Sequence, residues 1–468
     1  MSEDDLIRGT TSGPPSANPS QSPAHAQAPP PARAEARART LVAAQARSWA
    51  GIARRGLTSA CMGLIVVAAL GRLCWLGDME YKSDEREWVD TLVNLGRHPI
   101  SALAPESHHS GIPHSSGFFH FLRLISWSSP NPLVMVGAIA GFSAAVMLLG
   151  LALGRRSPSD LLAIAMMSTS LTLFVGTRKI WTPDLIPAWL ILGLVLWSAA
   201  ERARAPTKAA WLTAGAAFSF VMAPHMYLSA VPAAAAATLV PPVLWLSSPR
   251  ARPRRARRRA WIGGAVAGWA TFIPYLVARH AVRASPRSHP ALSAHELGEV
   301  LRDALTLPSP CKVFLAYLWP SAQSVRDHHP SLLLDLTLLW VILAVALWTP
   351  IFLALLARLL LRPRQTLGSP MVVASLLAWA GTSVGILASR LGSYINYWLA
   401  AVPFVYFAMA KVAYRSPRSL LTRFGRPALW LASLITFVAS AHFALLIHRS
   451  GGFPGEYGTS FRQQHGHP

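Results

Sequence analysis

The sequence alternates between long apolar runs and polar stretches over most of its length. Residues 331–361 are long for one span and carry Pro350, which predicts one kinked helix or two short ones. Residues 209–246 are also compatible with a re-entrant hairpin. We predict an all-α polytopic membrane protein with about 11 to 13 transmembrane helices. The apolar runs cover residues 57–76, 131–153, 160–176, 184–200, 209–222, 226–246, 261–279, 331–361, 370–389, 394–410 and 427–447.

Two polar regions between these runs are long enough to hold structure of their own, residues 77–130 and 280–330. The stretch SDEREWVDTLVNLG, starting at Ser83, has apolar residues at helical spacing, and HSSGFFHFLRLISW, starting at His114, is rich in aromatic residues. Both patterns predict helices that lie on the membrane surface. The second region is rich in proline, and HELGEVLRDAL predicts one short helix within it.

The two ends of the chain differ from the apolar middle. Residues 1–56 begin with a stretch rich in Pro, Ala and Ser that has too few apolar residues for a core, which predicts a disordered cytoplasmic tail. The bundle then covers residues 57–447 as one unit. Residues 448–468 form a short tail on the outer side.

The basic residues indicate the orientation of the bundle. With a cytoplasmic N-terminus, the inner segments carry 26 of the 43 Lys and Arg, as the positive-inside rule expects. The net charge of +23 is spread over these short loops, whereas nucleic-acid binding needs one basic soluble face. Because Arg and Ala are abundant, as in proteins of GC-rich bacteria, we expect a multi-pass protein of the bacterial cytoplasmic membrane and no nucleic-acid partner.

Acidic residues gather in the first outer loop. Of the 20 Asp and Glu in the chain, seven lie within residues 77–127. Carboxylates at the lip of a dry bundle can accept a proton or hold a divalent cation. The adjacent pair Asp84 and Glu85 is the best candidate, with Asp84 as a general base. As a helix N-terminal carboxylate, Asp84 would instead only stabilise its helix.

A short outer turn, VGTRKIWTPDLIPAW, joins the third and fourth apolar runs. Arg178 and Lys179 are suited to binding a phosphate, although they could equally anchor helix ends at the headgroups. Asp184 lies in the first turn of the next helix, where the dipole favours a carboxylate, but a charge at this depth is functional by default. No Walker loop, GxGxxG, HExxH, GxSxG or CxxC motif occurs in the chain.

The order of these features resembles the GT-C superfamily of membrane glycosyltransferases, which includes bacterial aminoarabinose transferases and protein O-mannosyltransferases. Asp84-Glu85 match the family's Asp-Glu pair after the first span, the segment from His114 to Phe119 its second-helix motif, Arg178, Lys179 and Asp184 its basic-then-Asp turn, and Tyr394 to Pro403 its late Tyr-rich span. HSSGFF replaces the usual Pro-Pro-Leu, and no large C-terminal soluble domain follows. The match covers residues 57–280 well and 331–447 by hydropathy alone.

The resemblance implies transfer of a sugar from a polyprenyl-phosphate donor to an unidentified acceptor lipid, glycan or protein at the outer face of the membrane. Asp84, Glu85 and Asp184 are then the catalytic candidates, and Arg178 and Lys179 hold the donor phosphate. A divalent cation (Mg, Mn or Zn) between Asp84 and Asp184 is a further expectation. Further candidates for substrate contacts are His114, His225, Arg390, Tyr394 and Tyr397.

Two other classes fit parts of the pattern. An acyltransferase or polymer ligase of the cell envelope could use outer His and Arg residues without the Asp-Glu pair. A transporter is less consistent with the sequence, because it would need polar or broken helices near the midplane and often has repeats. The apolar runs have few charges, and no repeat is recognisable. Charged residues confined to the lip of the bundle therefore favour the transferase.

Overall fold

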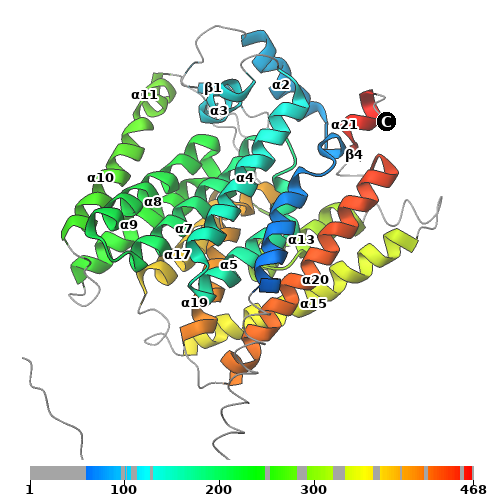
Figure 1. Ribbon diagram of the computed structural model, residues 1–468. Helices are drawn as coiled ribbons and strands as arrows, with labels where there is room; N and C mark the ends of the chain where they lie inside the picture. The colour runs from blue at the N-terminus through cyan, green and yellow to red at the C-terminus, as the bar shows by residue number, and fades with distance from the viewer. Residues whose placement is uncertain are drawn as a thin grey trace, which may run out of the picture. The chain divides into compact units, whose positions relative to one another are not determined.

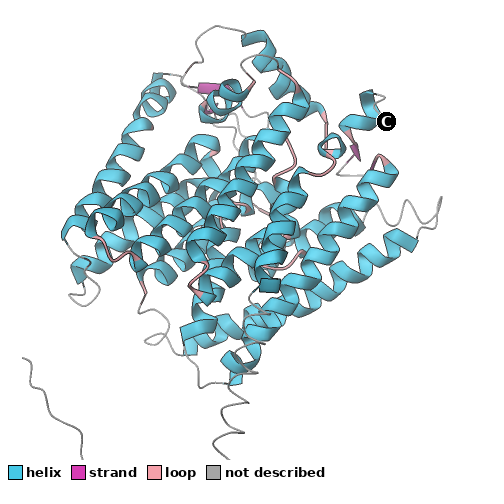
Figure 2. Ribbon diagram, viewed as in Figure 1, coloured by secondary structure: helices cyan, strands magenta, loops and turns pink. Residues whose placement is uncertain are grey.

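The computed structural model describes most of the chain after residue 58, and it consists almost entirely of helices (Figure 2). The sequence-predicted tail, residues 1–56, lies outside the described part. The described residues are 59–95, 101, 103–106, 113–126, 130–247, 253, 255–281, 292–319, 332–361, 369–389, 393–415, 420–453 and 458–465.

The predicted all-α class is confirmed. Seven helices in the described ranges are long and apolar enough to cross a membrane, and each coincides with a predicted span. They are α4 (Pro132–Gly154), η3 with α7 (Thr182–Arg202), η4 with α9 (Leu228–Leu246), α10 with α11 (Arg255–His280), α15 (Leu332–Leu361), α17 (Pro370–Ser389) and most of α20 (Phe424–Ser450).

The other four predicted spans also coincide with helices, but these are shorter, broken or less apolar. The first is the helix Ser59–Leu73, and the third is broken at Ser170 into α5 (Pro158–Thr169) and α6 (Leu171–Gly176). The fifth is α8 (Pro206–Met226), and the tenth is divided into α18 (Ile395–Trp398) and α19 (Val402–Arg415). Pro350 leaves α15 one continuous helix of 30 residues, and residues 209–246 are divided between two helices, α8 and α9 (Val231–Ser247), of 21 and 17 residues.

The long helices of the bundle form three closely packed groups. Helix α8 lies between α7 and α10, α9 packs on α17, and α15 pairs with α20 along its length (Figure 1). Gly193 on α7 lets Phe220 of α8 approach so closely that an added Cβ would lie 2.5 Å from the ring. Trp197, Phe220 and Trp261 fill the space between these three helices.

One end of the bundle carries the short elements, and we call it the α2 end (Figure 1). It contains α2 (Ser83–Leu95) and α3 (Gly117–Ile125), both of which the sequence predicts as helices. Strands β1 (Leu103–Glu106) and β2 (Pro113–Ser115) form a small antiparallel sheet between them. The C-terminal strands β3 (Gly452–Phe453) and β4 (Gly458–Thr459) and helix α21 (Phe461–His465) lie at the same end.

The predicted helix in the second polar region is α12 (Ala294–Thr306), which begins at a capping box between Ser293 and Glu296. It packs against α15 and α17. Asp303 is buried and accepts a hydrogen bond from Ser393 (2.6 Å), and it pairs with Lys312 at 2.7 Å. Trp379 of α17 donates to the carbonyl of Ala304. These contacts fix α12 against the elements that precede α19.

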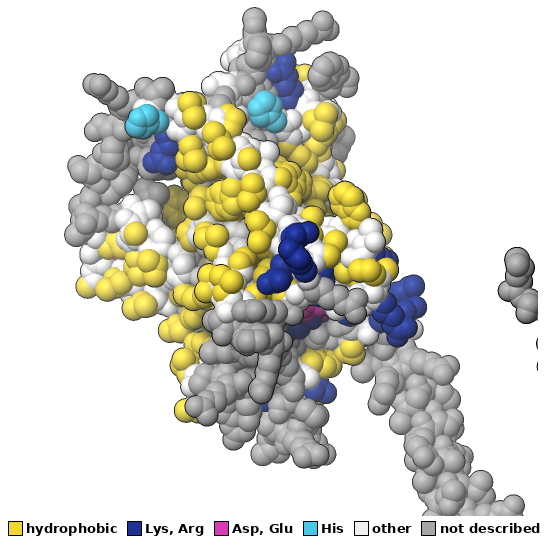
Figure 3. Space-filling view, turned by 90° about the vertical axis from the view of Figure 1, so that its left-hand side faces the viewer, with side chains coloured by type: hydrophobic (Ala, Val, Ile, Leu, Met, Phe, Trp, Pro, Cys, Tyr) yellow, Lys and Arg dark blue, Asp and Glu magenta, His cyan; other side chains and the backbone are white. Residues whose placement is uncertain are grey.

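Apolar side chains cover the face formed by α9 and α10 (Figure 3). Leu239, Val243, Ile262 and Val266 are more than half exposed on it, which is what a surface in contact with lipid needs. Arg255 and Arg259, at the start of α10, are exposed at one border of this face. By helix length and composition, this is a multi-pass membrane protein.

We expect the α2 end to face outward, because the basic residues concentrate in the opposite loops. In a variant without native cysteines, Ser83→Cys on α2 should react with a membrane-impermeant maleimide in intact cells. Arg255→Cys should react only after permeabilisation. The reverse labelling pattern would contradict the predicted orientation.

Candidate functional site

The two basic side chains of the turn after α6, Arg178 and Lys179, point into different surroundings. Lys179 approaches three buried carboxylates, whereas Arg178 lines a pocket beside α6. Both side chains are almost completely buried. Capping of η3 (Thr182–Leu185) fixes the turn, because the carboxylate of Asp184 accepts a hydrogen bond from the backbone N–H of Trp181 at 3.1 Å. The sequence-predicted group of Arg178 and Lys179 is thus divided between two sites.

The first site, which we call the acidic cluster, consists of Glu80, Glu85 and Asp184 around Lys179. The Lys179 ammonium pairs with Glu80, which also binds Lys82 at 2.6 Å. Glu85 and Asp184 lie close enough to Lys179 and to each other for their charges to interact. All three carboxylates are at most 3% exposed. The cluster joins α2, the residues before it and the turn, which are distant in sequence.

Burial and the neighbouring charge of Glu80 raise the pKa of Glu85 from about 4.5 to about 7. Lys179 and the backbone N–H of Lys82, which donates to Glu85 Oε2 at 2.9 Å, oppose this shift and are outweighed. A carboxyl group with this pKa gains and loses a proton near neutral pH. Glu85 is therefore suited to general acid or base chemistry.

Asp84 differs from its neighbour, because its side chain is exposed and accepts a hydrogen bond from the adjacent Ser83 Oγ at 3.4 Å. On a helix, successive residues point about 100° apart, so only one of the pair turns inward. Within the described ranges, no group of three or more His, Cys, Asp or Glu residues is arranged to hold a metal ion. The proposed roles of Asp84 as a base and of Asp84 and Asp184 as metal ligands stay predictions.

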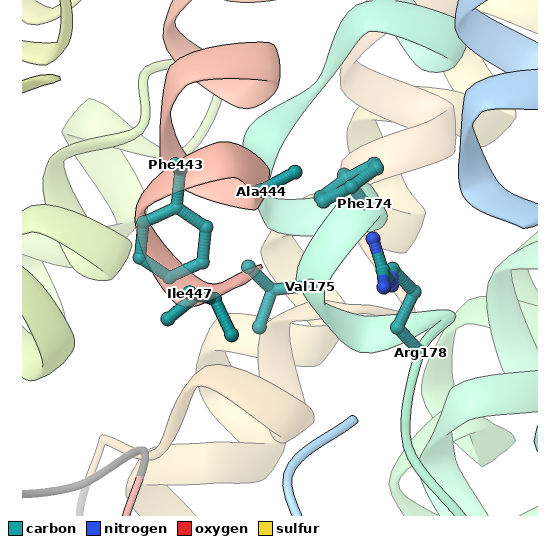
Figure 4. Close-up of a pocket in the computed structure, with 6 residues that line it drawn as sticks. All are labelled: Phe174, Val175, Arg178, Phe443, Ala444 and Ile447. Carbon is teal, nitrogen blue, oxygen red and sulfur yellow. The ribbon is translucent and has the colours of Figure 1, made fainter. Parts of the chain in front are cut away.

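The second site is a small pocket between α6 and α20. Phe174, Val175 and Arg178 face Phe443, Ala444 and Ile447 across it (Figure 4). The guanidinium of Arg178 lies 5.0 Å from the centre of the Phe174 ring and donates to the carbonyl of Trp75. Apart from Arg178, the lining is apolar.

The other sequence-predicted contact residues lie elsewhere. His225 is buried between Ser115 Oγ (3.3 Å) and Thr271 Oγ1 (2.9 Å), and Gly117 packs on its backbone, so it joins α3 to the bundle. Tyr397 is buried against Tyr227, whereas Tyr394 is 57% exposed. Arg390 and the side chain of His114, in β2, lie outside the described residues.

The C-terminal segment covers the residues just before α2. Asp78 is buried between His448 Nδ1 at 2.8 Å and Arg462 Nε at 3.2 Å. The backbone N–H of Phe461 donates to the carbonyl of Met79, and Gln464 donates to that of Tyr81. The described residues of the predicted short tail, 448–453 and 458–465, are therefore a packed part of the α2 end.

Sequence reasoning did not single out Glu80, Asp78 or Arg72. Glu80 and Asp78 were counted among the acidic residues of the first polar loop, but nothing local marks them as buried. The sequence does mark Arg72, because it is one of the few charged residues inside a predicted span. Charged residues within membrane spans are functional by default. Arg72 lies beside Arg178 and Phe174.

No protein-family model matches the chain, and no curated protein is significantly similar to it. The class is therefore defined by the structure alone: a helical, multi-pass membrane protein with buried charged groups at the α2 end.

The raised pKa of Glu85 predicts a pH dependence of stability. Between about pH 4.5 and 7 the folded state holds a proton that the unfolded chain releases, so stability falls as pH rises through this window. Glu85→Gln should remove a penalty of up to roughly 3 kcal/mol at pH 8. We expect its thermal midpoint in detergent to exceed that of the wild type at pH 8 and to match it near pH 4.5. Asp84→Asn, exposed and adjacent, is the control, and equal pH profiles for Glu85→Gln and the wild type would contradict a buried, shifted carboxyl.

Proposed function

We propose that the protein is a membrane glycosyltransferase that moves a sugar from a polyprenyl-phosphate donor to an acceptor at the outer face of the bacterial cytoplasmic membrane. One observation carries the proposal. A single turn presents a buried guanidinium, Arg178, to an apolar pocket and a lysine, Lys179, to three buried carboxylates. Transfer from a lipid phosphate needs this pairing of a cation for the leaving group and a carboxylate for the incoming hydroxyl.

In the proposed reaction, the acceptor hydroxyl gives its proton to the carboxylate of Glu85 while its oxygen attacks the anomeric carbon. The bond between that carbon and the phosphate oxygen breaks, and the lipid phosphate leaves with the bonding electron pair. Arg178 stabilises the negative charge that develops on the phosphate. Burial and the neighbouring charge of Glu80 keep the pKa of Glu85 near neutrality, where a general base is most effective.

Glu85 rather than Asp84 is the proposed base because it is the buried member of the pair. The proposal includes a divalent cation held by Asp84 and Asp184. A polymer ligase or acyltransferase could use outer His and Arg residues without the Asp-Glu pair and would take a different donor, so the choice of donor decides between these classes.

The function is tested with purified protein and a panel of polyprenyl-phosphate hexoses and pentoses, polyprenyl-diphosphate glycans and acyl donors. We expect release of polyprenyl phosphate from a sugar donor. Mass spectrometry of envelope lipids and glycans from a deletion strain identifies the acceptor. Turnover with the acyl or diphosphate donors alone would replace the proposed class by the corresponding alternative.

The roles of the two adjacent carboxylates are separated by matched variants. Glu85→Gln keeps the hydrogen bond from Lys82 but cannot accept a proton, so turnover should fall at least ~100-fold. Asp84→Asn should retain near-normal turnover. The opposite result, a loss in Asp84→Asn alone, would move the base to Asp84.

A further inference from the structure

The C-terminal segment, which runs from β4 to the end of α21, lies along residues 78–82, which precede α2 (Figure 1). The backbone N–H of Phe461 donates to the carbonyl of Met79 at 3.2 Å, and Gln464 Nε2 donates to that of Tyr81 at 2.6 Å. The ring of Tyr81 packs edge-on against that of Phe461, with 5.0 Å between their centres. The C-terminal segment therefore holds residues 78–82 through both backbone and side chains.

Arg462 ties the same residues to the end of α20. Its Nε lies 3.2 Å from Asp78 Oδ1, and its Nη2 donates to the carbonyl of His448. His448 Nδ1 lies 2.8 Å from Asp78 Oδ2, and the His448 ring stacks on that of Trp75. Because Asp78 is buried, removing the charge of Arg462 would raise the cost of keeping Asp78 in place.

Residues 78–82 also supply two parts of the acidic cluster. Glu80 pairs with Lys179, and the backbone N–H of Lys82 donates to Glu85 Oε2 at 2.9 Å. The first contact places one carboxylate of the cluster, and the second orients another. The geometry of the acidic cluster thus depends on residues that the C-terminal segment holds.

We propose that Arg462 is a positioning residue, which acts through Asp78 to hold residues 78–82, and with them Glu80 and Glu85, in place for proton transfer. A segment from the far end of the chain thereby becomes part of the site. The effect on turnover rests on the proposed function, because it takes Glu85 as the general base. The effect on the protonation of Glu85 does not depend on that function and is measured separately.

Detachment of the C-terminal segment would change the surroundings of Glu85. The groups that face Glu85 are Glu80 and Tyr81 from the residues before α2, and Lys179 and Asp184 from the turn after α6. Burial is the largest cause of the raised pKa of Glu85, and the charge of Glu80 is the next. Entry of water and movement of Glu80 would both lower this pKa toward its ordinary value.

The first test measures the protonation of Glu85 through stability, without any substrate. In full-length protein in detergent at pH 8, Glu85→Gln should raise the thermal midpoint. In the presence of Arg462→Gln, the same substitution should raise it at most about half as much. Gln463→Ala, at an exposed position of α21, is the control and should leave the rise unchanged. A merely structural Arg462 would lower the midpoint equally with and without Glu85→Gln, so an undiminished rise would overturn the proposal.

The second test measures turnover against pH. A general base must be deprotonated, so turnover should rise with pH through the pKa of Glu85. In Arg462→Gln this rise should move to lower pH by about one unit, a tenfold change in proton affinity, and Arg462→Lys should restore most of the wild-type profile. A profile that does not move in Arg462→Gln would contradict the positioning role.

Should Arg462→Gln not fold, Gln464→Ala replaces it in both measurements, because it removes the hydrogen bond to the carbonyl of Tyr81 and leaves the ion pair of Asp78 intact. A diminished rise in the stability test without transfer from any sugar donor would retain the positioning role of Arg462 and reject the transferase.

Discussion

The ion pair between Lys179 and Glu80 is the contact on which the α2 end depends. Both side chains are about 95% buried, so each would impose a large desolvation cost without the other. The pair joins the turn after α6 to the residues before α2 and so fixes where Glu85 and Asp184 lie. Removing Lys179 would leave Glu80, Glu85 and Asp184, which already repel one another, without this cation.

Other carboxylates buried in the bundle are likewise paired with a cation, which offsets the cost of their burial. Asp160 of α5 binds Arg202 of α7 and Lys411 of α19, and Ser198 donates to it at 2.8 Å. Asp303 is paired with Lys312, and Asp78 with Arg462. In each case the cation comes from another element, so the ion pairs join separate elements of the bundle. The buried guanidinium of Arg72 instead donates to two backbone carbonyls, those of Met167 and Ser168.

Arg178 and Lys179 lie in different sites because the backbone of the turn points their side chains in different directions. Arg178 and Lys179 are adjacent and share a charge, yet one contributes to an apolar pocket and the other to an acidic cluster. Asp84 and Glu85 differ in the same way, one exposed and one buried. Adjacent residues in a turn or a helix point in different directions, so a shared motif does not imply a shared site.

The sequence alone determined the class of the protein and the position of its helices. Apolar runs of bilayer length and the spacing of Trp88, Leu92 and Leu95 are local signals, and the helices α2, α3 and α12 were predicted from such patterns. The tertiary structure decided which charged groups meet. Arg72 contacts carbonyls 95 and 96 residues away, and Asp78 contacts His448 across 370 residues. Such contacts depend on how helices pack and which face each turns inward, and hydropathy along the chain does not encode either.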